Sequence, residues 1–152
     1  MSRQKKFGSL AMCLLASLAS GCGGIYDASV TGKVTLEGSP VPRGTVSYNP
    51  VQQGPTAYGL IKEDGSYLVR VGREEGLPAG EYRVSVVANE ESTPNKNPSL
   101  PPTPGKPITP RWYRSSKTSG LNATVSAGAN KIDLELTTEP PTDWKPPKRR
   151  RR

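Results

Sequence analysis

The sequence contains no histidine and only two cysteines, Cys13 and Cys22, among its 152 residues. The lack of histidine removes the commonest general base and the commonest zinc ligand. Two cysteines so placed offer no pair for metal or redox chemistry, and no glycine-rich phosphate loop precedes a helix. We therefore predict a protein without catalytic residues, metal ligands or cofactors, and not an enzyme.

Large aromatic side chains are also few, with one Phe, two Trp and six Tyr. Hydrophobic residues make up 33% of the chain, which is little for a large core. Glycine and proline contribute 16 residues each, a level typical of many turns and some unstructured chain. A chain of this length has room for one domain.

The positive charge is confined to the two ends of the chain. The net charge is +8, yet residues 22–137 hold 12 basic and 11 acidic residues and are nearly neutral. A charge excess limited to the ends is a weak sign of nucleic-acid binding. We expect no nucleic-acid partner, and we explain the two basic ends separately.

The N-terminus has the pattern of a secretory signal peptide. Residues 2–6 are polar and basic, and residues 7–20 are apolar or small. This run is shorter than the roughly 20 apolar residues of a membrane-spanning helix. We predict a signal peptide over residues 1–21 and an exported protein.

The segment Leu18-Ala19-Ser20-Gly21-Cys22 resembles the lipobox of bacterial lipoproteins, although its leucine falls one place early. The resemblance implies a diacylglyceryl group on Cys22, cleavage before it, and a linker over residues 22–27. The alternative is an ordinary signal peptide cut near Ala19 or Gly21, which leaves Cys22 as a free thiol. We favour lipidation because an exported chain with one unpaired cysteine has little other use for it. The protein is then anchored to a membrane at the periplasmic face or the cell surface.

Alternation of apolar and polar residues with period two predicts seven strands between residues 28 and 137. Asp64-Gly65 predicts a hairpin, because glycine accepts a positive φ, and residues 127–130 read as the turn between the last two strands. Short strands at regular spacing favour an all-β sandwich. The strands centre on residues 30–36, 46–48, 57–62, 67–71, 82–88, 121–125 and 132–136.

The order of several short motifs resembles a carboxypeptidase regulatory-like domain, as found in small planctomycete lipoproteins. This resemblance implies a single seven-stranded transthyretin-like or Ig-like β-sandwich over residues 28–137, usually an accessory or binding module. The motifs are VTGKV at 30–34, GSPVPRGTV at 38–46, EDGSY at 63–67, GLPAGEYRV at 76–84 and TSGLNATV at 118–125.

Arg111, Trp112, Tyr113 and Arg114 are candidate partner-binding residues, because aromatics interleaved with arginine can bind glycans or proteins. The alternative, which we favour, is that Trp112 and Tyr113 cover one edge of the sandwich. A core this poor in aromatics would use them.

Residues 90–110 are rich in proline, with five prolines spaced three apart from Pro98 to Pro110. A polyproline II helix has three residues per turn, so these prolines would form one stripe. We favour a stiff connecting loop, long enough to cross the sandwich from end to end, over a ligand for an aromatic groove.

Residues 138–152 predict a disordered tail, since they are too polar and proline-rich to form a core. The tail is a candidate binding arm for an anionic envelope polymer, anionic lipid or an acidic protein, and the alternative is that it only keeps the chain soluble. Its candidate binding residues are Arg149, Arg150, Arg151 and Arg152.

The sequence thus predicts a non-catalytic, lipid-anchored binding or structural module of the cell envelope. The alternatives are an accessory subunit of an envelope secretion or protease complex and, third, an enzyme with an unrecognised site. An enzyme would require side chains such as Glu74, Glu75 and Asp133 to converge in one pocket.

Overall fold

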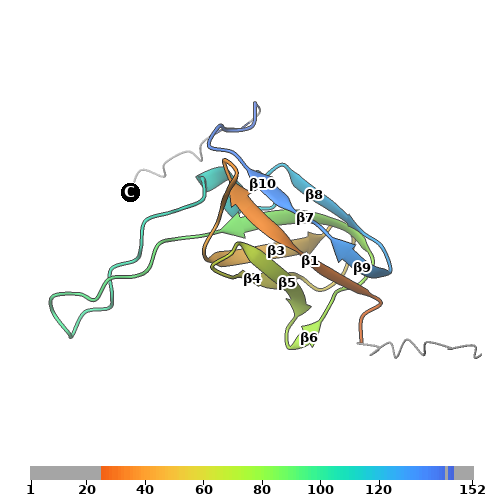
Figure 1. Cartoon of the computed structure of the whole chain (residues 1–152), viewed down its shortest axis with the longest axis horizontal. Coiled ribbons are helices and arrows are strands. Elements are labelled where there is room, and N and C mark those ends of the chain that lie inside the picture. The colour runs from red at the N-terminus through yellow and green to blue at the C-terminus, as the bar shows by residue number, and fades with distance from the viewer. Residues whose placement is uncertain (1–24, 143, 146–152) are drawn as a thin grey trace, which may run out of the picture.

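The computed structural model describes residues 25–142 and 144–145, so the expected signal peptide, Cys22 and Arg149 to Arg152 lie outside the described residues. The described chain is nearly all β, as predicted, with no α-helix and one 3₁₀ turn, η1 (Arg111–Arg114). Figure 1 shows the strands wrapped around a single core. The strands are β1 (Ala28–Leu36), β2 (Ser39–Pro40), β3 (Gly44–Pro50), β4 (Ala57–Ile61), β5 (Ser66–Val71), β6 (Glu74–Glu75), β7 (Gly80–Val87), β8 (Leu121–Val125), β9 (Gly128–Lys131) and β10 (Leu134–Leu136).

The strands form one sheet in the order β10-β1-β5-β4-β3-β7-β8, and β9 also pairs with β1. All pairings are antiparallel except those of β1 with β9 and β10. Although β8 and β9 pair at opposite ends of this order, only two residues separate them. Since three Cα–Cα steps reach about 11 Å, the sheet must curl until its two edges approach each other.

The sequence predicts seven strands, whereas the sheet has ten. Two of the additional strands, β2 and β6, are only two residues long. The third is β9 (Gly128–Lys131), which precedes the predicted last strand and lies alongside β1, as β10 does. The expectation that residues 127–130 form a turn is wrong, because residues 128–131 are β9.

The split between β9 and β10 has a local cause at Ile132 and Asp133. The Asp133 carboxylate accepts a hydrogen bond from the Lys33 backbone N–H at 2.8 Å, in place of a backbone carbonyl. The Ile132 carbonyl lies so close to Gly32 that a Cβ there would be 1.8 Å from its oxygen. Glycine at position 32 therefore allows the two chains to approach at this point.

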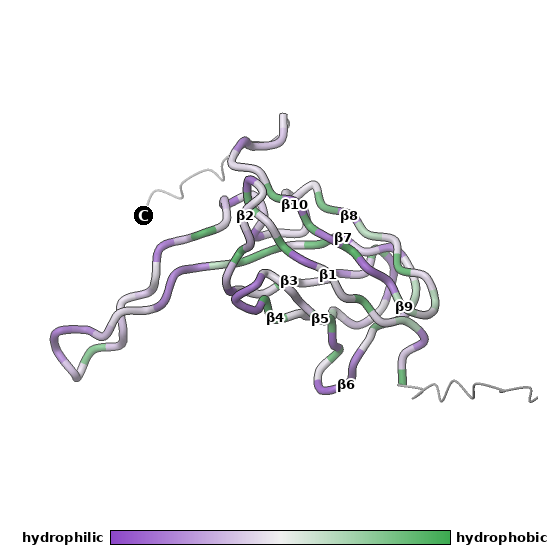
Figure 2. The backbone as a smooth tube through the Cα atoms, viewed as in Figure 1, coloured by the Kyte–Doolittle hydropathy of each residue, from purple (hydrophilic) through white to green (hydrophobic). Residues whose placement is uncertain are grey.

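The predicted alternation places the core where it was expected. Val30 and Val34 of β1 are fully buried, while Lys33 between them is exposed. In Figure 2 the strands carry most of the hydrophobic colour, and the loop after β7 carries little. The largest buried side chains include Tyr48, whose ring packs edge-on against Tyr82.

The hairpin between β4 and β5 also forms as predicted. Gly65 has a φ of +79°, and the Asp64 carboxylate accepts a hydrogen bond from the Ser66 N–H at 3.0 Å. This side-chain bond closes the turn locally. Hydrogen bonds from the Ser66 hydroxyl and backbone lower the pKa of Asp64 below its usual value.

The proline-rich loop projects from the body as a hairpin, which we call the arm (residues 89–108; Figure 1). Thr93 and Thr103 exchange backbone hydrogen bonds of 3.0 and 2.9 Å, and the Glu90 N–H donates to the Lys106 backbone carbonyl at 2.8 Å. The expectation that this segment crosses the sandwich is therefore wrong. Its two legs pair with each other, and Gly105 permits their contact, because a Cβ there would lie 2.0 Å from the Glu90 oxygen.

Candidate functional site

The arm is fixed to the body by Thr109, one of the few buried polar residues. Its hydroxyl accepts a hydrogen bond from the Ala88 N–H at 3.1 Å and lies 3.4 Å from the Val86 carbonyl. The Ile108 N–H also donates to the Ala88 carbonyl at 2.9 Å. The chain therefore leaves β7 and returns to it at the same place, directly before η1.

η1 is held to the end of β10 by Tyr113. The Tyr113 side chain is buried, and its hydroxyl accepts a hydrogen bond from the Thr137 N–H at 3.0 Å. The hydroxyls of the two residues are also 3.4 Å apart. Tyr113 is therefore part of the packing that closes this end of the sheet.

Trp112 is only half-buried, and its ring meets Trp144 edge-on, with ring centroids 5.4 Å apart. Its backbone carbonyl accepts a hydrogen bond from the Thr118 hydroxyl at 2.8 Å, which joins η1 to the turn that follows. The Trp112 Nε1–H is buried and has no hydrogen-bond partner among the described residues. A buried donor without a partner is costly.

The beginning of the expected tail contacts the domain. The N–H and hydroxyl of Thr138 both donate to the Glu37 carboxylate, at 2.6 and 2.8 Å. These bonds hold the pKa of Glu37 below its usual value. Further on, the Trp144 N–H donates to the Pro141 carbonyl at 2.9 Å and forms a turn that brings the indole to Trp112.

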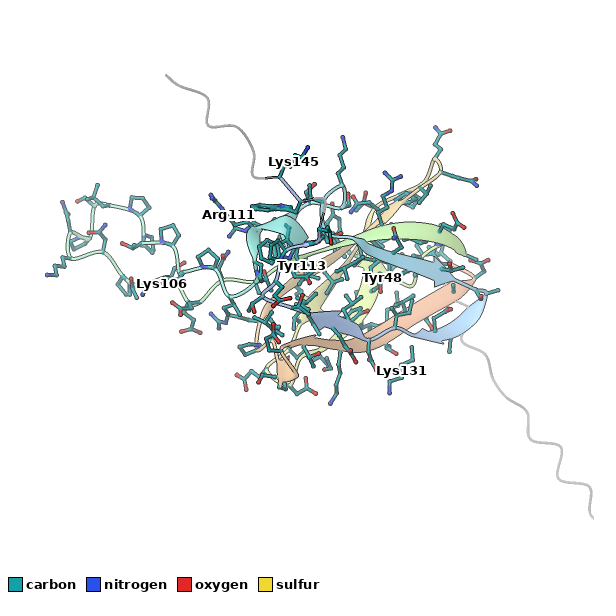
Figure 3. All side chains as sticks on the ribbon, turned by 90° about the horizontal axis from the view of Figure 1, so that it is seen from above. Tyr48, Lys106, Arg111, Tyr113, Lys131 and Lys145 are labelled. Carbon is teal, nitrogen blue, oxygen red and sulfur yellow. The ribbon has the colours of Figure 1, made fainter. Side chains whose placement is uncertain are left out.

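Four exposed cations lie close to the two tryptophans in the sequence: Arg111 and Arg114 in η1, Lys117 in the turn that follows, and Lys145 next to Trp144. None of them takes part in the three ion pairs found among the described residues, which are Arg43–Glu91, Arg70–Glu75 and Lys131–Asp133. Arg114 instead donates to the Asn89 side chain at 2.9 Å. Figure 3 shows Arg111 and Lys145 at the η1 end of the molecule, away from Lys131.

The structure thus assigns different surroundings to the four candidate residues in η1. Tyr113 is buried, Trp112 is half-buried under Trp144, and both arginines are exposed. The sequence did not indicate that Trp144 and Glu37 belong to the same region. The only signal was a second tryptophan four residues after Pro140.

The opposite end of the domain has a shallow cleft of about 390 Å³. It lies between the β3–β4 loop and the start of β7, where the Tyr82 hydroxyl donates to the Pro78 carbonyl at 2.8 Å. Prolines and glutamines predominate in its lining, which includes Pro50, Gln52, Gln53, Pro55 and Pro78. Glu81 is the one charged residue in that lining.

The carboxylates that we considered for catalysis have separate partners. Glu75 pairs with Arg70, and Asp133 binds the Lys33 backbone. Within residues 25–142 and 144–145, no group of three His, Cys, Asp or Glu side chains is placed to hold a metal ion. No helix in this part of the chain is long and apolar enough to cross a membrane.

Comparison with known proteins gives no relative for this chain. A scan of protein-family models and searches of curated proteins and of solved structures found no match.

Proposed function

We propose that this protein is a non-catalytic module anchored to the cell envelope by a lipid on Cys22, and that it binds its partner at the end of the domain formed by the arm, η1 and Trp144. The observation that carries this proposal is that the described chain begins at one end of the domain, whereas the arm, η1 and Trp144 lie at the other. The described chain begins three residues after Cys22, at the end of the sheet far from the arm (Figure 1).

The strand directions give the same arrangement. β1 begins near the chain entry and runs for nine residues, about 27 Å, to the other end of the sheet. β9 and β10 run parallel to β1. From β1 the sheet continues through β5, β4 and β3 to β7, and each of these four pairings is antiparallel. Four reversals restore the direction, so β7 runs the same way as β1. β7 therefore ends, and the arm begins, at the end where β10 leads into Thr137. A lipid on Cys22 would leave this end facing away from the membrane.

Lipidation is tested by metabolic labelling of the full chain with an alkyne-tagged fatty acid. We expect label and membrane association for the native chain, and neither for Cys22→Ser. A chain that carries no label, is exported and reacts with maleimide at Cys22 would show an ordinary signal peptide and overturn the anchor. Arg73→Ala, at an exposed residue of the body, is a matched control that should keep the label.

The fold also supports a finer proposal, a variant of the seven-stranded transthyretin-like sandwich of carboxypeptidase regulatory-like domains. The motif EDGSY (63–67) coincides with the β4–β5 hairpin, and GLPAGEYRV (76–84) leads into β7. Seven strands remain when β2 and β6 are set aside and β9 and β10 are counted as one. An experimental structure that showed an unrelated strand order would contradict this proposal.

The arm favours a second candidate function, that of an accessory subunit in an envelope protein complex. It stands off the body, its prolines at positions 98, 101, 104 and 107 are exposed, and Leu100 is 53% exposed. Such a segment adds little to the core and offers a stiff surface to a partner. Site-specific crosslinking from position 100 in cells tests this: one discrete protein adduct supports a subunit role, and none excludes contact through the arm tip.

A further inference from the structure

We propose that the exposed face formed by Trp112, Trp144 and four cations binds an anionic polysaccharide. We call it the cationic indole face, and its cations are Arg111, Arg114, Lys117 and Lys145. The inference rests on the proposed function in one respect: the lipid anchor is what makes a polymer of the envelope, and not the anchoring membrane, the available partner of this face.

The charge of the face indicates an anionic ligand. Its four cations are exposed and take part in none of the ion pairs found among the described residues. The carboxylate of Glu37 already accepts two hydrogen bonds from Thr138. Among the described residues of the tail after Thr137, Glu139 is the one exposed carboxylate. Guanidinium groups are suited to carboxylate and sulfate or phosphate groups because they can donate two parallel hydrogen bonds.

The two indoles indicate a sugar ring in preference to a simple anion. Both tryptophans are half-buried, so part of each residue is exposed to solvent, and their rings meet at a 65° angle. The C–H faces of a pyranose ring are apolar and flat, and they pack against an indole while the ring substituents reach flanking cations. Arg111 directly precedes Trp112 and Lys145 directly follows Trp144 in the sequence, and Figure 3 shows both cations at the η1 end of the molecule.

A protein ligand fits this face less well. Protein interfaces are centred on exposed apolar side chains that become buried. The exposed large hydrophobic residues of the described chain are Ile25, Val51, Tyr58, Leu60 and Leu100, and none belongs to η1 or to the tail turn. A repeating anionic chain needs only charges and flat apolar edges, both of which are present here.

The chain contains only two tryptophans, and both belong to this face, so tryptophan fluorescence reports on it directly. The experiment uses the full chain carrying Cys22→Ser, titrated with polygalacturonate and with dextran sulfate. Neutral dextran, poly-glutamate, a single-stranded oligonucleotide and anionic phospholipid vesicles are the comparison ligands. We expect a saturable spectral change with at least one anionic polysaccharide, and binding at least about tenfold weaker for every comparison ligand.

Variants separate the face from the basic tail. We expect Trp144→Ala or Arg111→Ala to weaken polysaccharide binding about fivefold or more, and Arg73→Ala, at an exposed arginine of the opposite end, to leave it unchanged. Trp144→Ala leaves the net charge unchanged, so a loss with this variant cannot be general electrostatics. Neutralising Arg149 to Arg152 by glutamine should reduce binding only in part.

Three results would overturn the proposal. One is equal or tighter binding of the oligonucleotide, poly-glutamate or vesicles. Another is binding that disappears with the tail arginines and is indifferent to Trp144→Ala. The last is no response to either polysaccharide. Because the assay uses a chain without the anchor, each of these results is independent of whether Cys22 is lipidated in cells.

Discussion

The Tyr67 hydroxyl donates a hydrogen bond of 2.6 Å to the backbone carbonyl of Ile132. It also lies 2.8 Å from the Tyr48 hydroxyl, which must be the donor of that second bond, since the Tyr67 proton is used. The chain of bonds crosses the core from β3 through β5 to the break between β9 and β10. It thereby satisfies a carbonyl that has left the regular sheet.

Replacing Tyr67 by Phe should be more destabilising than replacing Tyr48 by Phe. Tyr67→Phe leaves both the Ile132 carbonyl and the Tyr48 hydroxyl without their partner, at a cost of about 1–3 kcal/mol. Tyr48→Phe removes only the donor to Tyr67. Urea denaturation measures the difference. Tyr58→Phe, at a residue that is 53% exposed, is the control and should leave the free energy of unfolding unchanged. Equal losses for the two buried tyrosines would contradict the chain of bonds.

The same pair makes stability depend on alkaline pH. Burial raises the pKa of Tyr48 to about 12, and it raises the pKa of Tyr67 as well. In the unfolded chain both ionise near pH 10, so the stabilisation is complete below about pH 10 and is lost as pH rises toward 12. Tyr48 alone should account for about 2 kcal/mol of unfolding free energy between these values. Denaturation at pH 8 and pH 11.5 tests this, and Tyr48→Phe should show a smaller difference.

Gly32→Ala should be strongly destabilising. The new Cβ would lie 1.8 Å from the Ile132 oxygen, and backbone atoms cannot yield cheaply. We expect a loss of about 3 kcal/mol or more, or no folded protein. Gly54→Ala is the matched control, because its Cβ would meet only ordinary contacts at 3.5 Å with Pro50. Circular dichroism with thermal melting compares the two, and a Gly32→Ala protein as stable as Gly54→Ala would refute the close approach.

Glu37→Gln should loosen the segment that carries Trp144. The Glu37 carboxylate accepts both bonds from Thr138, and its pKa is lowered by them. A lowered pKa means that the contact is complete at neutral pH and weakens as pH falls through the folded-state value. We expect Glu37→Gln to shift tryptophan emission to the red at pH 8. In the native chain a red shift should also appear on acidification, as Glu37 becomes protonated below the usual glutamate pKa. No change of emission with the substitution or with pH would contradict the contact.

The arm and Thr109, the residue that fixes the arm to the body, should differ in their effect on stability. Replacing residues 90–106 with Asn-Gly removes exposed chain whose legs mainly contact each other, so we expect a melting temperature within a few degrees of the native value. Thr109→Val removes a buried hydroxyl that serves Ala88 and should cost about 1–2 kcal/mol. Differential scanning calorimetry of both variants tests this. A large loss on removing the arm would show that it supports the body.

Local patterns predicted much of the fold. The alternation around Val30 and Val84 located long strands, and Asp64-Gly65 located a hairpin, because both depend on neighbours in sequence. The division of the last strand was not predictable, since it depends on Gly32 and Tyr67, which lie far from Ile132 along the chain. The pairing of the arm was missed for a related reason: proline spacing indicates stiffness and does not indicate which segment lies alongside.

The candidate site was predicted only in part. The pattern around Arg111 showed aromatic and basic residues together, and the structure separates a buried Tyr113 from a half-buried Trp112. The contribution of Trp144 and Glu37 could not be read from the sequence, because their contacts join segments 32 and 101 residues apart. Contacts at such separation leave no local pattern.

The parallel pairing of β1 with β9 and β10 has a consequence for biogenesis. The bond between Lys33 and Asp133 joins residues 100 positions apart, so the first strand remains without one neighbour until nearly the whole chain is present. Long-range pairing of this kind slows folding, because the entropy cost of closing the long loop comes before the stabilising contacts form. If the protein is exported with its N-terminus first, as we propose, β1 cannot gain its neighbours β9 and β10 until residues 128–136 have crossed the membrane. The sheet would then be completed only on the far side.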